Sequence, residues 1–172
     1  MPLMPHITHA HLLDCETVAA LAAKTFTDSF GHMYSAEDLA SHLASKCSAA
    51  YFEQSLRAGS TILMAKLDGK LVGYAKVGHV ELPVKPLPAG AVEIHRVYVD
   101  KAFQGQGIGK AIMLYILALP KVDHAPIVYL GVWEDNVRAQ GLYTLYGFEA
   151  VGRYLYYVGT HADREIIMAR QR

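Results

Sequence analysis

Three glycines at alternate positions constrain the fold of this chain more than any other feature. Residues 104–110 read Gln-Gly-Gln-Gly-Ile-Gly-Lys and separate a stretch rich in Val, Ile and Tyr from an apolar stretch with helical periodicity. Because glycine has no Cβ and tolerates positive φ, several backbone N–H groups in such a turn can point into one cavity. The helix that begins there adds a partial positive charge, and Lys110 adds a full one. The turn is therefore expected to bind a phosphate or pyrophosphate.

Two common phosphate-binding loops do not fit these residues. A Walker loop, G-x-x-x-x-G-K-[ST], needs one more residue between Gly105 and Lys110, and a hydroxyl side chain where Ala111 stands. A dinucleotide-binding fingerprint, G-x-G-x-x-G, follows the first strand of a βαβ repeat. Here the glycines read G-x-G-x-G and lie deep in the chain, after a helical front and a hairpin. Both loops are excluded.

The order of elements predicts a mixed α/β (α+β) fold in one domain spanning residues 1–172. No internal repeat, low-complexity tract or linker divides the sequence. Asp14 and Ser35 are expected to cap the first two helices, and Pro120 to end the third. A Pro-rich, exposed connection is expected over residues 78–90. The expected helices are 14–30, 35–56, 108–119 and 136–146, and the expected strands are 5–8, 61–67, 70–77, 91–100, 127–133, 148–158 and 165–170.

Composition excludes several other classes of protein. The 16 Lys and Arg balance the 16 Asp and Glu, so the chain lacks the basic face of a nucleic-acid-binding protein. The longest apolar stretch, 111–119, is too short to cross a membrane, and the first residues do not resemble a secretory signal, so a cytoplasmic location is expected. Cys15 and Cys47 are expected to be buried free thiols. The nine histidines show no metal-ligand spacing, and no metal is expected.

Motifs around the glycine turn resemble those of one enzyme family. Gln104, Gly107 and Gly109 match the pattern Q/R-x-x-G-x-G/A, and Asn136, Ala139, Tyr143, Gly147 and Phe148 match N-x-x-A-x-x-x-Y-x-x-x-G-F. Both patterns, with the strand 93–99 before them, resemble the GNAT superfamily of acyl-coenzyme A dependent N-acetyltransferases. Segments 26–30, 34–39, 131–134, 163–165 and 168–170 are further similar to the PaiA-type polyamine acetyltransferases.

The resemblance implies a fold and a cosubstrate. The implied fold has a mixed, mostly antiparallel sheet of six or seven strands that splays between strands 4 and 5, flanked by about four helices. Acetyl-CoA is the implied cosubstrate, with its pantetheine arm on the exposed edge of the fourth strand, where a backbone N–H would face the thioester oxygen. The implied binding residues are Val97, Tyr98, Val99, Gln104, Gly105, Gln106, Gly107, Ile108, Gly109, Lys110, Asn136, Ala139 and Tyr143.

Two residues are candidates for proton transfer. Tyr143 matches the family tyrosine that protonates the leaving thiolate; the alternative is a buried tyrosine that hydrogen-bonds a carbonyl. Glu93 matches a strand glutamate that takes the amine proton through water, and burial would raise its pKa toward neutrality. The alternative for Glu93 is a structural partner of Arg96 or of a neighbouring lysine. His95 is a second candidate base, and many family members use none.

The acceptor is expected to be a primary amine of a small molecule, with a polyamine favoured over an antibiotic amine, an amino acid or a protein N-terminus. Other hypotheses are a catalytically silent domain that binds or senses coenzyme A, and a partner-binding domain. A homodimer that pairs the last strands, from Tyr154 on, is also allowed by the sequence. The expected acceptor pocket has acidic residues and aromatic walls, with helix-face charges as the alternative: Asp28, Glu37, Asp38, Glu53 and Glu81, with Tyr34 and Tyr51.

Overall fold

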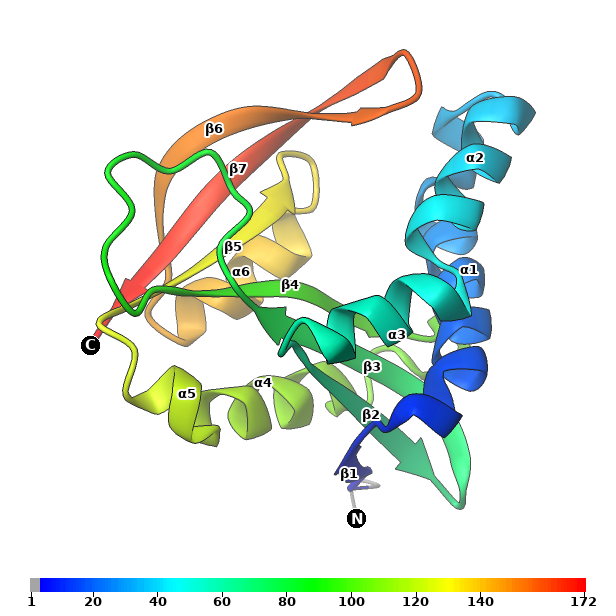
Figure 1. Ribbon diagram of the computed structural model, residues 1–172, viewed down its shortest axis with the longest axis horizontal. Coiled ribbons are helices and arrows are strands. Elements are labelled where there is room, and N and C mark those ends of the chain that lie inside the picture. Colours follow the sequence, from blue (N-terminus) through cyan, green and yellow to red (C-terminus); the bar gives the residue numbers. More distant parts are fainter. Residues whose placement is uncertain (1–3) are drawn as a thin grey trace.

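A seven-stranded sheet with helices on both faces forms the framework of the computed structural model, which describes residues 4–172 (Figure 1). The strand order is β1-β2-β3-β4-β5-β7-β6. The strands are β1 (His6–His9), β2 (Thr61–Leu67), β3 (Lys70–Gly78), β4 (Val92–Val99), β5 (Ile127–Trp133), β6 (Glu149–Val158) and β7 (His161–Gln171). The helices are α1 (Cys15–Phe30), α2 (Ala36–Lys46), α3 (Ala49–Arg57), α4 (Ile108–Ala118), α5 (Pro120–Asp123) and α6 (Val137–Leu145).

Alternating residues of the central strands divide the core into two layers. Leu63 and Ala65 of β2 face the layer that contains α4, α5 and Tyr143 of α6. Ile62 and Met64 face the layer that contains α1, α2 and α3. This alternation is the period-2 pattern of a strand buried on both faces. The sheet is therefore covered on both sides, as the α/β pattern predicts.

The front of the chain differs from the sequence prediction in its helix boundaries. Ser35 caps α2 as expected, because its Oγ accepts a hydrogen bond from the backbone N–H of Asp38 at 3.1 Å. The predicted helix 35–56 is, however, two helices, since Ser48 caps a new one through the N–H of Tyr51 at 3.2 Å. Asp14 precedes α1 without capping it, and its carboxylate accepts from the N–H of His11 instead. Pro120 starts the short helix α5, because proline fits the first helical position.

Strands β4 and β5 are paired over only part of their length. They are parallel, and their register covers three pairs that end at Ile94 and Leu130. On its other edge β4 pairs with β3 as far as Val99, and β5 pairs with β7 along its whole length. Beyond Ile94 the two strands therefore separate, as expected for strands 4 and 5, while all other neighbours are antiparallel. The predicted mixed, splayed sheet is confirmed.

A β-bulge in β4 changes which side chains share a face. Lys76 and Val77 are adjacent in β3, and they pair with Arg96 and Ile94 of β4. His95, which lies between these two residues of β4, is therefore an extra residue without a partner in β3. A regular strand would place Glu93 and Arg96 on opposite faces of the sheet. With the extra residue, Ile94 and Val97 both pack into the same core layer, which leaves Glu93 and Arg96 on the other face.

The connection between β3 and β4 is a long, mostly exposed loop, as predicted. Its side chains Val80, Leu82 and Val84 pack against Tyr129 of β5 and Ile167 of β7. Its backbone is held by Glu93, whose Oε2 accepts hydrogen bonds from the N–H groups of residues 81 and 82 at 2.6 and 3.1 Å. The loop is thus attached to the strand that carries the candidate base.

None of the helices within residues 4–172 combines the length and the apolar character needed to cross a membrane. Strand β6 lies at the edge of the sheet and exposes Val151, Leu155 and Tyr157. Pairing of this edge with a second chain stays a prediction.

Candidate functional site

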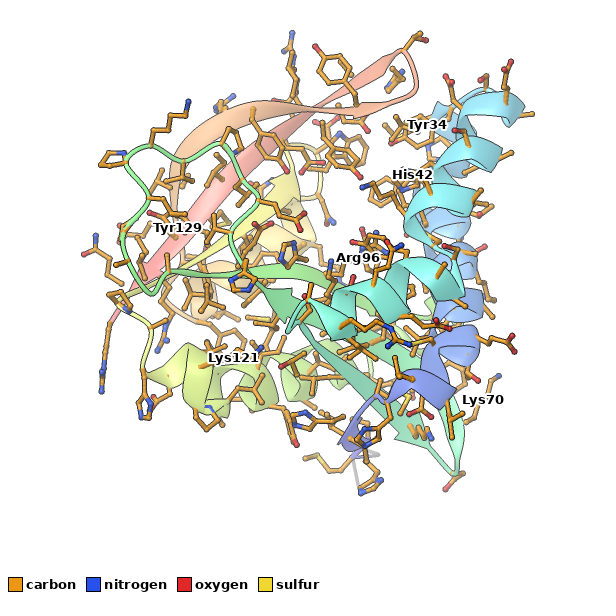
Figure 2. The ribbon with its side chains drawn as sticks, viewed as in Figure 1. Tyr34, His42, Lys70, Arg96, Lys121 and Tyr129 are labelled. Carbon is orange, nitrogen blue, oxygen red and sulfur yellow. The ribbon has the colours of Figure 1, made fainter. Side chains whose placement is uncertain are left out.

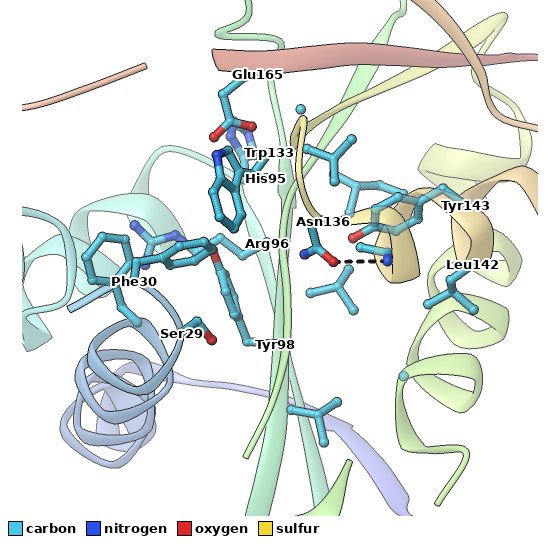
Figure 3. A pocket seen from close by; sticks show the side chains of 18 of the residues that line it. Ser29, Phe30, His95, Arg96, Tyr98, Trp133, Asn136, Leu142, Tyr143 and Glu165 are labelled. Atoms are coloured by element: carbon cyan, nitrogen blue, oxygen red, sulfur yellow. Dashed lines mark hydrogen bonds between the residues drawn. The ribbon is translucent and has the colours of Figure 1, made fainter. Parts of the chain in front are cut away.

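A cavity of about 1010 Å³ opens where β4 and β5 separate. Two groups of residues line it, on either side of β4 (Figure 3). Asn136 and Tyr143 lie on one side, with the glycine turn, and we call this the cradle side. Arg96, Phe30 and Glu165 lie on the other side, which we call the chamber.

The glycine turn forms the end of the cradle side. Gly105 and Gly107 have φ of +80° and +83°, values that an L side chain rarely adopts. Gly107 caps α4 without a side chain, and the first backbone bond into the helix runs from Ala111 to its carbonyl. The preceding N–H groups, of residues 108–110, consequently have no acceptor within the helix. Lys110 and Arg138 line the same cavity and add positive charge to it. Together with the free N–H groups and the helix dipole, these charges suit a pyrophosphate.

The edge of β4 continues the cradle side away from the turn. Val97, Tyr98 and Val99 line the cavity, and their strand pairs with β3 but not with β5 at this point. Their unpaired backbone groups can therefore bind an extended ligand as an added strand would. Gln104 is tied to the end of this strand, since its Nε2 donates to the carbonyl of Val99 at 3.1 Å.

Helix α6 supplies the opposite wall of the cradle side. Asn136 caps the helix, and its Oδ1 accepts from the N–H of Ala139 at 3.1 Å (Figure 3). Tyr143 lies two turns along and is 9% exposed. Burial raises the pKa of Tyr143 to about 12, so the phenol keeps its proton at neutral pH. Within residues 4–172 its hydroxyl makes no hydrogen bond, so the alternative of a carbonyl-bound tyrosine finds no partner.

Glu93 is a buried carboxylate on the chamber side of β4. Its Oε2 accepts the two loop N–H groups, and its Oε1 lies 3.3 Å from Nδ1 of His95. Burial raises the pKa of Glu93 to about 7, although the loop amides oppose the shift. Its structural partners are thus backbone amides, not Arg96 or a lysine as the alternative proposed. A carboxyl group with such a pKa can accept or release a proton near pH 7.

His95 adjoins Glu93 on the bulge. Burial, with a smaller contribution from the charge of Lys76, lowers the pKa of His95 to about 4. The imidazole is therefore neutral at pH 7, and it too can accept a proton.

Strand β7 brings two carboxylates to the chamber that sequence reasoning did not assign to the site. Burial, and then the neighbouring charge of Asp163, raise the pKa of Glu165 to about 7. Asp163 accepts a hydrogen bond from the Tyr34 hydroxyl and lies 3.0 Å from Nε2 of His161. Acidic residues at positions 163 and 165 of one strand would indicate two carboxylates on the same face of the sheet. The predicted strand began at 165, whereas β7 begins at His161, so position 163 was not expected to lie in a strand.

Gln106 of the glycine turn was predicted to bind the cofactor, but it does not line the cavity.

Most of the acidic residues predicted for the acceptor pocket do not line the cavity. Tyr34, Tyr51 and Glu81 line it as predicted. Four predicted acids do not: Asp28, Glu37, Asp38 and Glu53. These four lie on the helices α1 to α3, and Asp28 forms an ion pair with Lys24 at 2.9 Å, as the helix-face alternative proposed.

No group of three or more His, Cys, Asp or Glu within the described part of the chain could hold a metal ion. Cys15 and Cys47 are free and buried, as predicted.

Comparisons with known proteins agree with this geometry. A model of the acetyltransferase (GNAT) family matches residues 21–148. An uncharacterized N-acetyltransferase of Mycobacterium tuberculosis is 30% identical over 161 residues, which cover 93% of this chain and 99% of the relative. A spermine/spermidine N(1)-acetyltransferase of Bacillus subtilis is 30% identical over 86 residues, or 49% of this chain and 57% of the relative. The PaiA N-acetyltransferase of Thermoplasma acidophilum, solved in complex with coenzyme A, has a TM-score of 0.77 at 20% identity, with 98% and 99% of the two chains covered.

The raised pKa of Glu93 predicts a pH-dependent stability. In the unfolded chain Glu93 ionises near its ordinary pKa of 4.5, whereas the folded protein holds its proton to about pH 7. Its contribution to stability is therefore complete below pH 4.5 and is lost as the pH rises through 7. Glu93→Gln lacks this loss, so its unfolding free energy relative to the parent should increase by about 2 kcal/mol between pH 5 and pH 8. Urea unfolding at both pH values measures the difference.

Glu149→Gln is the matched control, because Glu149 is exposed on β6. Its unfolding free energy relative to the parent should not change with pH. If the unfolding free energies of the parent and of Glu93→Gln change by the same amount between pH 5 and pH 8, the raised pKa of Glu93 is contradicted.

Proposed function

The chain belongs to the acetyltransferase (GNAT) family and is an acetyl-CoA dependent N-acetyltransferase, and from that premise we propose that it acetylates a primary amine of a small molecule. One observation carries this proposal. The same cavity joins a glycine cradle and an unpaired strand edge to a chamber with buried carboxylates, and the buried Tyr143 phenol lines its cradle side. A thioester and an amine can therefore approach each other from opposite sides of β4.

The cradle side fits acetyl-CoA, which supplies an activated acetyl thioester. The free N–H groups at the start of α4, with Lys110 and Arg138, would hold the pyrophosphate. The edge formed by residues 97–99 would hold the pantetheine arm, and a backbone N–H of this edge would polarise the thioester carbonyl. The absence of a Cβ at Gly107 keeps this space open, since no atom lies within 4 Å of the position that a Cβ would occupy.

Proton transfers complete the reaction. The amine must lose its proton before its nitrogen can attack, and Glu93, with a pKa of about 7, is the proposed acceptor of that proton. As the new C–N bond forms and the C–S bond breaks, the nitrogen loses a second proton and the sulfur gains one. The Tyr143 phenol donates the proton to sulfur, and the proton lost by nitrogen restores the phenol. The balance is one amine and one thioester consumed, and one amide and one thiol formed. His95 remains the alternative base.

Two classes of small amine could pair an ammonium group with the carboxylates of the chamber. A polyamine, favoured by the sequence, would place ammonium groups near Glu93, Glu165 and Asp163. An amino acid would use the same carboxylates for its single ammonium group. A cation beside a buried carboxylate favours the ionised form of that carboxylate, so both classes would bind at neutral pH.

The proposal predicts amine-dependent release of coenzyme A. Acetyl-CoA at roughly 100 times its dissociation constant should stabilise the protein by about 2.7 kcal/mol, measured by thermal unfolding. Free thiol should then appear only when an amine is added from a panel of polyamines, amino acids, aminoglycosides and peptides. Binding without thiol release for any amine would favour the silent sensor. No binding would contradict the proposed cosubstrate site.

The cradle predicts a glycine-specific effect at position 107. Gly107→Ala forces an L residue to φ near +83°, which costs about 1–2 kcal/mol and moves the N–H groups of the turn. Affinity for coenzyme A, measured by calorimetry, should fall at least tenfold. Gly141→Ala is the control, because Gly141 lies within α6 with open space around its Cβ position and should bind coenzyme A as the parent does. Equal affinity in both variants would exclude the turn from the site.

Tyr143→Phe should separate chemistry from binding. Loss of the proton donor should lower kcat by about a hundredfold or more, with affinity for coenzyme A nearly unchanged, because the ring remains in place. Tyr157→Phe, on the exposed part of β6, should leave both unchanged. Unchanged turnover in Tyr143→Phe would exclude Tyr143 as the group that protonates the thiolate.

A further inference from the structure

Three cations surround one aromatic ring in the chamber. The Nζ atoms of Lys76 and Lys46 lie 4.6 and 5.7 Å from the centre of the Tyr51 ring, and the guanidinium carbon of Arg96 lies 4.8 Å from it. These residues come from β3, α2 and β4, and Tyr51 comes from α3. Figure 2 shows Arg96 in the region between β4 and the helices α2 and α3, with His42 nearby. We call Lys46, Lys76 and Arg96 the cationic cluster.

The cationic cluster has no carboxylate partner within the described residues. The salt bridges found in residues 4–172 involve other side chains, so no Asp or Glu oxygen lies within 4.0 Å of these three cations. Lys76 acts on Glu93 from further away, where its charge partly opposes the rise in pKa that burial causes. Since Glu93 has a pKa of about 7, it is only partly ionised at neutral pH and does not balance three charges.

The remaining neighbours of the cluster are neutral. Arg96 Nη1 reaches the Tyr74 hydroxyl at 3.5 Å and the Cys47 sulfur at 4.0 Å, both at the outer limit of a hydrogen bond. Burial, followed by the charges of Arg96 and Lys46, lowers the pKa of His42 to about 4, so this ring stays uncharged. Lys76 is buried and Arg96 is half-buried, whereas Lys46 is exposed. Cations that are removed from water and lie close to another cation are unfavourable unless an anion joins them. The cluster therefore calls for an anion from the cavity.

Two cations of this cluster and the tyrosine that they surround line the space where an acceptor would bind. Arg96, Lys46, Tyr51 and Tyr74 all line the cavity. Lys76 Nζ donates to the Tyr51 hydroxyl at 2.8 Å, which leaves the proton of that hydroxyl free to bind another acceptor. In Figure 3 Arg96 leaves β4 on the side opposite Asn136 and Tyr143. An anion here would be separated from the proposed thioester site by β4 and would not compete with the pyrophosphate.

We propose that the cationic cluster is an oxyanion subsite for the acceptor, which therefore carries a carboxylate in addition to its primary amine. The inference rests on the proposed function. The amine would face Glu93 and Glu165 while the carboxylate meets Arg96, Lys46 and the Tyr51 hydroxyl. A polyamine would place an ammonium group beside these cations, and like charges repel. The acceptor class is thus a zwitterionic amino acid, in preference to a polyamine.

A matched series of acceptors tests this subsite. Aminoalkanoates from glycine to aminohexanoate are compared with alkylamines and diamines of equal chain length, by thiol release. At the best length, kcat/KM for the aminoalkanoate should exceed that for the alkylamine and the diamine by at least about tenfold. Aminoalkyl phosphates, run beside them, show whether the oxyanion is carboxylate or phosphate, and a preference for either supports the subsite. Equal or better use of the diamines would overturn it.

Variants connect the preference to the cluster. Arg96→Gln should lower kcat/KM for the aminoalkanoate about tenfold or more and leave that for the alkylamine, which has no carboxylate, nearly unchanged. Lys46→Gln, at an exposed position, should act in the same direction and serves where Arg96→Gln does not fold. Arg57→Gln, an exposed residue at the end of α3, is the control and should change neither. An equal loss for acceptors with and without the carboxylate, in both cluster variants, would overturn the subsite.

A binding measurement separates failure of the subsite from failure of the proposed function. Calorimetry compares N-acetylaminoalkanoates with N-acetylalkylamines on the complex of the protein with coenzyme A, where no turnover is needed. Binding that requires both the carboxylate and Arg96 supports the subsite even if no amine is acetylated, in which case the proposed function fails alone. Acetylation of amines without any preference for an oxyanion, together with Arg96-independent binding, leaves the proposed function standing and overturns the subsite.

Discussion

The separation of β4 from β5 is the constraint on which the rest of the structure depends. Each strand is held on its outer edge by an antiparallel neighbour, yet the two pair with each other over three residues that end at Ile94 and Leu130. Beyond that point the backbone of residues 97–99 has donors and acceptors without a strand partner. Buried backbone groups need hydrogen bonds, so a ligand that can pair with a strand completes the sheet there. The cavity, the cradle and the chamber all exist because the strands part.

The bulge at His95 divides the chemistry between the two sides of β4. It lets Val97 continue the apolar layer under α4 while Glu93 and Arg96 share the chamber. The proposed base, Arg96 of the proposed oxyanion subsite and the edge proposed to polarise the thioester are thereby placed on one short strand. Carboxylates of β7 and cations of β4 and α2 line the same cavity, so charge is organised locally although the chain carries equal numbers of acidic and basic residues. Recognition then depends on position within the cavity and not on net charge.

Much of the cradle side could be predicted from the sequence because its functional groups are close in the chain. The turn at Gly107, the start of α4 and the Asn136 cap of α6 use backbone groups or short-range contacts, which local sequence specifies. The break between α2 and α3 was missed, since a serine cap inside a periodic stretch resembles an ordinary helical serine. The early start of β7 was missed for a similar reason, because Asp163 does not favour a strand by propensity.

The sequence by itself determined the class of fold and the glycine turn, because both follow from local patterns, and its resemblance to a known family made Tyr143 and Glu93 candidates. Only the tertiary structure decided which charges face the acceptor. Tyr51, Arg96 and Glu165 are brought together by strand pairing and helix packing over long sequence separations, and the extra residue at position 95 sets the face on which Arg96 lies. No pattern of hydrophobic periodicity shows a bulge or a shared cavity, since both arise from contacts between elements that are distant in the chain.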